Sequence, residues 1–196
     1  MNAGGRPSRP KPMQAASFAG ASVLGHDRLV TKAITYPFEP KSIAYLRAGQ
    51  FWAVPLSDGR FGCGRVLHVP SPSGPQPSLY LNTRIFLAGL MDWSGDEPPT
   101  AQAIAGCKLL EQGRVHVAAI TDTGSKILGQ RDLELDGLSG LLEVSHRGGG
   151  TVWLYEGGKC LRPATAQERQ SLPVMSVWGR RVIVRLAEKY LTRRQQ

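Results

Sequence analysis

Two apolar, aromatic-rich runs separated by a polar Asp-Gly pair form the clearest pattern in the chain. The first run covers residues 49–56 and the second covers residues 61–69, with Asp58 and Gly59 between them. An Asp-Gly pair between two runs of strand-forming residues is typical of a β-hairpin. The pattern therefore predicts an antiparallel hairpin over residues 49–69.

The loop length of this hairpin sets which residues face each other. A four-residue loop moves Pro55 to a non-hydrogen-bonded position, which suits a residue that has no N–H to donate. This register pairs Trp52 with Arg65, and the pair favours a cation–π contact of roughly 0.5–1 kcal/mol if it is exposed. On the other face, Gly62 and Gly64 let the sheet bend or another backbone approach closely.

Further alternating or apolar runs predict the rest of a mainly antiparallel sheet. The expected strands are residues 79–93, 115–121, 126–129, 141–145, 151–155 and 159–162. Short helices are expected within residues 100–110 and 163–171, and residues 175–191 show the strongest helical spacing, with basic residues on the opposite face. The expected fold is α+β and mainly β: a coiled antiparallel or barrel-like sheet with a C-terminal α-helix packed on it.

The length and composition of the chain indicate a single domain preceded by a basic N-terminal segment. The chain has 196 residues, of which 41% are hydrophobic and 20% charged, so it is long and apolar enough for one domain with a core. Residues 1–40 begin with a stretch rich in Ala, Gly, Ser and Pro, and we expect them to be a disordered or poorly ordered basic segment. Residues 41–192 are expected to form a single domain.

The positive charge lies at the two flanks of the chain. The formal net charge is +9, to which residues 1–48 contribute +5, residues 177–196 contribute +5 and the centre −1. A small β-barrel nucleic-acid-binding module that uses these basic flanks is therefore an alternative function. A dedicated nucleic-acid domain more often carries its charge on the fold itself, so nucleic acid is the less favoured partner.

Cysteine usage and apolar run length point to the cytoplasm. The three cysteines, Cys63, Cys107 and Cys160, are odd in number and widely spaced, which is typical of reduced thiols. No apolar run has the length of a membrane span, and no continuous apolar stretch follows the basic residues at the N-terminus. We therefore expect a cytoplasmic protein that does not bind a membrane.

No pattern of catalytic or metal-binding residues is present in the sequence. The four histidines lack metal-ligand spacing, and residues 132–143 match a calcium loop poorly because Glu134 takes the place of Asp or Asn. We expect no catalytic residue, no metal and no cofactor, and hence no enzyme. A hydrolase that uses His116 or His146 is the least favoured alternative, because no nucleophile can be placed beside either histidine.

The hairpin also resembles a known family. Residues 51–67 read Phe-Trp-Ala-Val-Pro-Leu-Ser-Asp-Gly-Arg-Phe-Gly-Cys-Gly-Arg-Val-Leu, which resembles the opening hairpin of the immunity protein 26 family. Members of that family are encoded beside bacterial polymorphic toxins and are taken to neutralise them by binding. The resemblance implies that residues 41–192 are an immunity-type domain whose partner is a cognate toxin domain encoded nearby. The oligomeric state is left open.

A binding protein needs an exposed anchor inside a polar rim, and two segments offer one. The first is the expected loop after residue 91, where Trp93 lies among acidic residues that would be steered toward a basic cleft of a toxin. The second is the hairpin tip. The expected partner-binding residues are Asp92, Trp93, Asp96, Glu97, Asp58 and Arg60. The expected structural residues of the hairpin are Trp52, Pro55, Gly62, Gly64 and Arg65.

Overall fold

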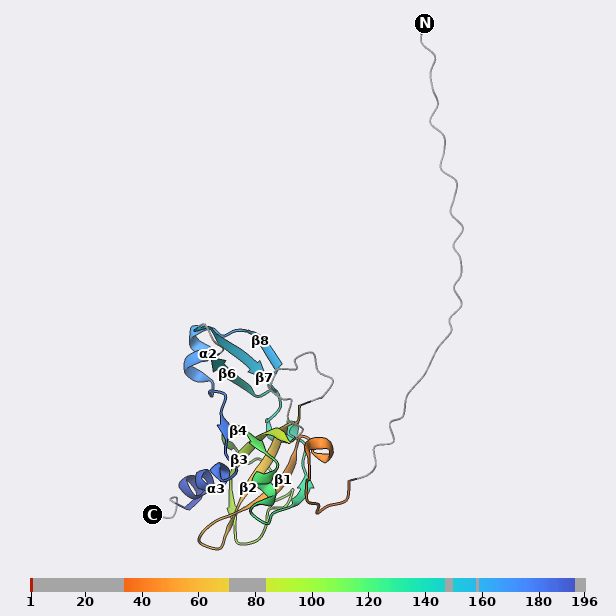
Figure 1. The fold of residues 1–196 in the computed structure, drawn as a ribbon, viewed down its shortest axis with the longest axis vertical. Coiled ribbons are helices and arrows are strands. Elements are labelled where there is room, and N and C mark those ends of the chain that lie inside the picture. The colour runs from red at the N-terminus through yellow and green to blue at the C-terminus, as the bar shows by residue number, and fades with distance from the viewer. Residues whose placement is uncertain (2–33, 71–83, 147–149, 158, 193–196) are drawn as a thin grey trace. The chain divides into compact units, whose positions relative to one another are not determined.

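Strands make up most of the regular secondary structure in a computed structural model that describes Met1 and residues 34–70, 84–146, 150–157 and 159–192 (Figure 1). Residues 34–196 form one unit and are described by themselves. In chain order the elements are η1 (Ile43–Tyr45), β1 (Gln50–Pro55), β2 (Phe61–His68), β3 (Ile85–Gly95), β4 (Leu109–His116), α1 (Ala118–Thr121), β5 (Ile127–Gln130), η2 (Glu134–Asp136), β6 (Leu142–His146), β7 (Val152–Glu156), β8 (Lys159–Pro163), α2 (Ala166–Ser171), β9 (Val177–Trp178), α3 (Val182–Ala187) and η3 (Glu188–Thr192).

Two sheets organise these elements. A six-stranded sheet has the order β5-β1-β2-β3-β4-β9, and a three-stranded sheet has the order β6-β7-β8. All neighbours are antiparallel except β4 and β9. The expected mainly β fold with a helix near the C-terminus is confirmed. The barrel-like alternative is wrong for the described residues, because β5 and β9 are opposite edges of an open sheet.

The β1–β2 hairpin forms as expected, but its register differs by one residue. Trp52 lies opposite Gly64, and Phe51 lies opposite Arg65. The loop has three residues, not four, because the Gly59 N–H donates to the Leu56 carbonyl at 3.2 Å and closes a tight turn. Gly59 has a φ of 85°, which glycine adopts without steric cost and which ends the three-residue hairpin loop.

This shift places Trp52 and Arg65 on opposite faces of the sheet, so the expected cation–π pair does not form. The Trp52 side chain is fully buried and contacts Phe86 edge-on, with ring centroids 5.9 Å apart. A Cβ atom on Gly64 would lie 2.3 Å from the Trp52 indole, and one on Gly62 would lie 2.8 Å from Leu191. The two glycines therefore make room for side chains of the core, and not for another backbone.

We expect Gly64→Ala to lower the free energy of unfolding by about 1–3 kcal/mol, because the added methyl group overpacks the site against Trp52. Chemical denaturation followed by tryptophan fluorescence measures this loss. Gly179→Ala is the matched control, because its Cβ atom would have no neighbour closer than 3.9 Å. Equal stability of the two variants would contradict this account of Gly64.

The main core lies on the Trp52 face of the six-stranded sheet. Helix α3 and the following π-helical turn η3 contribute Ile183, Ala187 and Leu191 to it. The expected helix over residues 175–191 therefore begins seven residues late. Val177 and Trp178 pair with β4 instead, and the Trp178 indole fills the space above Gly113, where a Cβ atom would lie 2.3 Å away.

The expected strand over residues 115–121 is also wrong after its second residue. Strand β4 ends at His116, whose Nδ1 accepts the Ala118 N–H at 3.0 Å. This side-chain contact turns the chain into the short helix α1, in which residues 118–120 are buried. Alternation alone did not reveal the turn, because both faces of this segment are apolar.

The second face of the six-stranded sheet carries a buried ion pair. Arg65 is fully buried and its Nη1 lies 2.6 Å from Oδ2 of Asp136, whose side chain is also fully buried. Arg131 adds a second ion pair to the same carboxylate at 3.0 Å, and the Gly106 N–H donates to it at 2.9 Å. These bonds tie two connecting segments, near residues 106 and 136, to the middle of strand β2.

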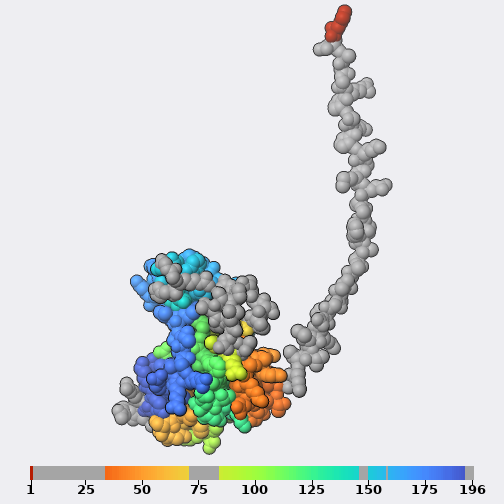
Figure 2. Space-filling model, in the orientation of Figure 1, coloured from red at the N-terminus to blue at the C-terminus, as the bar shows by residue number. Residues whose placement is uncertain are grey.

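The two sheets are joined by residues 173–178. The Val144 N–H on β6 donates to the Pro173 carbonyl at 2.9 Å, and the Met175 N–H donates back to Val144 at 2.7 Å. Two residues further on, β9 pairs with β4 of the other sheet. Arg114 of β4 and Glu143 of β6 add a buried ion pair between the sheets. Figure 2 shows this C-terminal part of the chain, in blue, at the molecular surface.

The unit that starts at Ile34 includes residues before the boundary expected at residue 41. Phe38 exchanges two backbone hydrogen bonds with Ile127, at 3.0 and 2.8 Å, and Tyr36 packs against Phe38. The remainder of the expected N-terminal segment, residues 2–33, lies outside the described residues, as does the start of the expected strand over residues 79–93. Among the described residues, no helix is both long and apolar enough to cross a membrane.

Candidate functional site

The structure brings the two expected binding segments together at one end of the six-stranded sheet. Strand β2 begins at the hairpin tip, and its first residues, Phe61 and Gly62, lie opposite Gly95 and Ser94 at the end of β3. Arg60 Nη1 donates to the Ser94 hydroxyl at 3.1 Å and so links the two segments directly. We call residues 57–60 together with residues 94–97 the tip surface.

Arg60 holds the tip surface in one arrangement. Its Nε and Nη2 donate to Oδ2 of Asp58 at 2.9 and 2.8 Å, and its Nη2 also donates to the Leu191 carbonyl at 3.3 Å. The hydrogen bonds from Arg60 hold the pKa of Asp58 below its usual value, so Asp58 stays ionised at neutral pH. The arginine expected to contact a partner is thus largely occupied in ordering the tip.

Exposed carboxylates outnumber cations on this surface. Asp58, Asp96 and Glu97 are exposed, whereas Arg60 is half-buried. Glu188 of η3 lies beside the tip, where it accepts the Ser57 N–H at 2.5 Å and the Ser57 hydroxyl at 3.0 Å. The tip surface is therefore negatively charged on a chain whose net charge is +9. Such a local field attracts a positively charged partner.

Trp93 does not project from this surface as expected. Strand β3 continues to Gly95, so Asp92 and Trp93 lie in a strand and not in a loop, and both are half-buried. The Trp93 indole lies over Gly95, where a Cβ atom would be 2.9 Å away, and packs against the apolar cluster that contains Met91 and Ile104. Substitution of Trp93 would therefore disturb the fold as well as any contact with a partner.

The five expected structural residues all lie in the hairpin, but in different surroundings. Trp52, Gly62 and Gly64 pack on the main core, and Arg65 lies in the buried ion pair of the other face. Pro55 ends β1 opposite Phe61 and lines an open groove at the start of α3.

Two features that could serve a partner or a ligand were missed from the sequence. One is Glu188, whose carboxylate accepts hydrogen bonds from Ser57 at the hairpin tip although no local pattern in the sequence singles it out. The other is the groove lined by Pro55, Asp122, Thr123, Arg181, Val184 and Arg185. Its residues come from three segments far apart in the chain, so no local pattern indicates it.

Of the two histidines considered for catalysis, His116 has ordinary surroundings, and the side chain of His146 lies outside the described residues. Burial and then the nearby Arg180 and Arg84 lower the pKa of His116, whose Nδ1 already accepts a backbone N–H. Burial and Arg114 lower the pKa of His68. Among the described residues, no group of three or more His, Cys, Asp or Glu side chains could hold a metal ion.

The fold and the tip surface thus define a mainly β protein with an acidic surface at one end of an open sheet. Comparison with protein-family models, with curated proteins and with solved structures gives no match to this chain.

Proposed function

We propose that the protein is an immunity protein that neutralises a cognate bacterial toxin by binding it stoichiometrically, without turnover. The resemblance of residues 51–67 to the immunity protein 26 family supports this proposal. The observation that carries it furthest is the tip surface, because two segments expected separately to bind a partner meet through the bond between Arg60 and Ser94.

The charge of the tip surface favours a basic partner. Asp58, Asp96 and Glu97 are exposed, and the contacts of Arg60 and Glu188 fix the backbone that carries them. A preformed surface loses little conformational freedom on binding, which favours affinity. A toxin with a basic cleft, such as a nuclease, fits this description.

The test is capture of partners by the tagged full-length chain from a nuclease-treated lysate of its own cells, followed by kinetic measurement with the purified partner. We expect the capture to recover one toxin, which is released from the tagged chain only by denaturant. Neutralising the surface with Asp96→Asn and Glu97→Gln together is expected to slow association by about tenfold at low salt, with an unchanged Tm.

Asp132→Asn together with Glu134→Gln is the matched control for this experiment, because it also removes two exposed negative charges. Glu134 is exposed and lies in η2, near the Arg65–Asp136 ion pair and away from the hairpin tip. An association rate that falls equally in the control would contradict a role of the tip surface. Recovery of nucleic-acid-associated proteins, lost steeply as salt rises, would contradict the immunity function and favour the nucleic-acid-binding module.

A further inference from the structure

An open groove of about 630 Å³ lies between the end of β1, the segment after α1 and the first turn of α3. This volume is within the usual range for small-molecule sites, which is about 300–1,000 Å³. Its lining is distinct from the tip surface and shares no residue with it. A ligand bound in the groove would therefore occupy a site separate from the proposed toxin-binding surface.

The walls of the groove are fixed by hydrogen bonds. The Thr123 hydroxyl donates to the Ile120 carbonyl at 2.7 Å, and the Ser125 hydroxyl donates to the Ala53 carbonyl on β1 at 2.7 Å. On the other side, the Arg185 N–H donates to the Arg181 carbonyl and holds the first turn of α3. The groove is thus built from three segments with defined positions.

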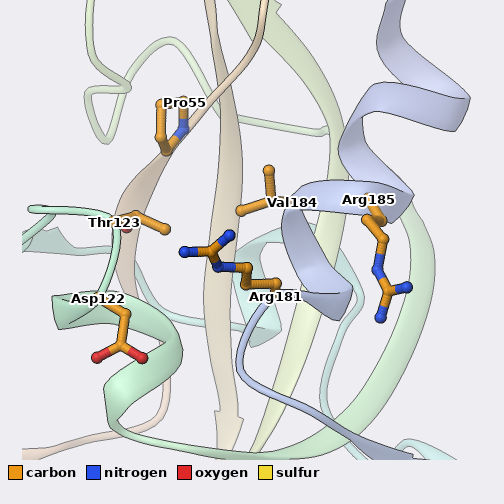
Figure 3. A pocket seen from close by; sticks show the side chains of 6 residues that line it. All are labelled: Pro55, Asp122, Thr123, Arg181, Val184 and Arg185. Carbon is orange, nitrogen blue, oxygen red and sulfur yellow. The ribbon is translucent and has the colours of Figure 1, made fainter.

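Two arginines give the groove a positive charge. Arg181 and Arg185 lie one helical turn apart and are both exposed. Figure 3 shows Arg181 reaching from α3 toward the segment that carries Thr123, with Arg185 on the other side of Val184 in this view. Within the described part of the chain, neither guanidinium forms an ion pair.

The acidic residue of the lining does not neutralise these arginines. Oδ2 of Asp122 lies 3.4 Å from Nη1 of Arg180, an arginine that does not line the groove. Asp122 therefore already has a cationic partner. Val184 supplies apolar surface next to the guanidinium of Arg181 in this view, and Pro55 adds apolar surface farther along the same groove (Figure 3). A cationic groove with an apolar wall matches a ligand that has an anionic head and an apolar body.

We propose that this groove binds a small organic anion whose phosphate or carboxylate head pairs with Arg181, with Arg185 adding positive charge at the rim. The apolar body of the ligand lies against Pro55 and Val184. Guanidinium groups suit both heads because their parallel N–H donors match the spacing of phosphate and carboxylate oxygens.

The test is a calorimetric or NMR titration of the full-length chain with phenyl phosphate and with benzoate, and with benzyl alcohol as the neutral comparison. We expect one or both anions to bind saturably at millimolar concentration and benzyl alcohol not to bind. Arg181→Ala is expected to weaken binding by about tenfold or more, which is the effect of losing a charged hydrogen-bond partner.

Two further variants make the test specific. Arg169→Ala removes an exposed arginine from α2, on the three-stranded sheet side, and is expected to leave binding unchanged. Val184→Thr keeps the side-chain shape but makes the apolar wall polar. In parallel titrations, it is expected to weaken the binding of phenyl phosphate more than the binding of inorganic phosphate, because only phenyl phosphate uses the apolar wall.

Three outcomes would overturn the proposal. The first is the absence of saturable binding of both anions at millimolar concentration. The second is an equal loss of affinity in Arg169→Ala and Arg181→Ala, which would indicate general attraction to a basic protein. The third is Arg181-dependent binding of a single-stranded oligonucleotide with no binding of either small anion, which would assign the arginines to nucleic acid.

Discussion

Replacing Asp136 with Asn is expected to lower the free energy of unfolding by about 3–5 kcal/mol, because it leaves the charge of the fully buried Arg65 without its carboxylate. The remaining partners of Arg65 are the backbone carbonyls of Arg131 and Asp132, at 2.6 and 3.2 Å, which carry no net charge. Denaturant titration measures the loss. For a chain of this length, each kcal/mol lowers the Tm by about 2–4 °C.

The control is Asp132→Asn, four residues earlier in the same segment. Asp132 is exposed, and its contact with Arg65 is made by its backbone carbonyl, which the substitution keeps. Its expected effect is within about 0.5 kcal/mol. If Asp132→Asn and Asp136→Asn were equally stable, the buried ion pair would not support the fold as described.

The lowered pKa of Asp136 makes the free energy of unfolding depend on pH. Burial alone would raise the pKa of Asp136, but hydrogen bonds from Arg131, Gly106 and Arg65 outweigh it and hold the pKa well below its usual range. A carboxylate of lowered pKa stabilises the fold above its unfolded pKa of about 3.9, and this stability is lost as the pH falls below that value. The wild-type chain should therefore lose more stability than Asp136→Asn between about pH 5 and pH 2, as measured by thermal melts.

Replacing Glu143 with Gln is expected to cost about 3 kcal/mol or more, since it leaves Arg114 charged between the two sheets. Arg114 and Glu143 are 4% and 1% exposed, and Nη1 of Arg114 lies 3.1 Å from the carboxylate. Glu156→Gln is the control, because Glu156 is an exposed carboxylate on the adjacent strand β7. Urea denaturation of both variants gives the comparison.

A double substitution separates the loss of attraction between Arg114 and Glu143 from the cost of burying the Arg114 charge without Glu143. Arg114→Met combined with Glu143→Leu removes both charges and keeps apolar volume between the sheets. We expect it to be more stable than Glu143→Gln, because a buried ion pair costs about as much to desolvate as it returns. A double variant less stable than Glu143→Gln would contradict this explanation.

Local patterns in the sequence predicted most elements, whereas long-range contacts set the details that matter for the site. The hairpin over residues 49–69 was recognisable from its apolar runs and from Asp58 and Gly59. Its register was not, because one residue of loop length decides whether Trp52 faces Arg65 or Gly64. The expected Trp52–Arg65 pair is therefore replaced by a buried arginine on one face and a buried tryptophan on the other.

The start of the C-terminal helix and the surroundings of Trp93 were missed for a related reason. Residues 175–191 have helical spacing throughout, yet Trp178 fits the space above Gly113 on a strand distant in the chain and draws Val177 into the sheet. Trp93 has acidic neighbours typical of a loop, but β3 continues past it. In both cases a partner far away in the sequence determines the conformation.

The joining of the two sheets by residues 173–178 has a consequence for how the chain folds during synthesis. The backbone bonds from Val144 to Pro173 and Met175, and the pairing of β9 with β4, all require residues made late. Until these residues leave the ribosome, β4 and β6 each have one edge without its final partner and are open to pairing with other chains. The edges of β4 and β6 are therefore completed only after residues 173–178 are available, and a chaperone that shields open strand edges would raise the yield of folded protein.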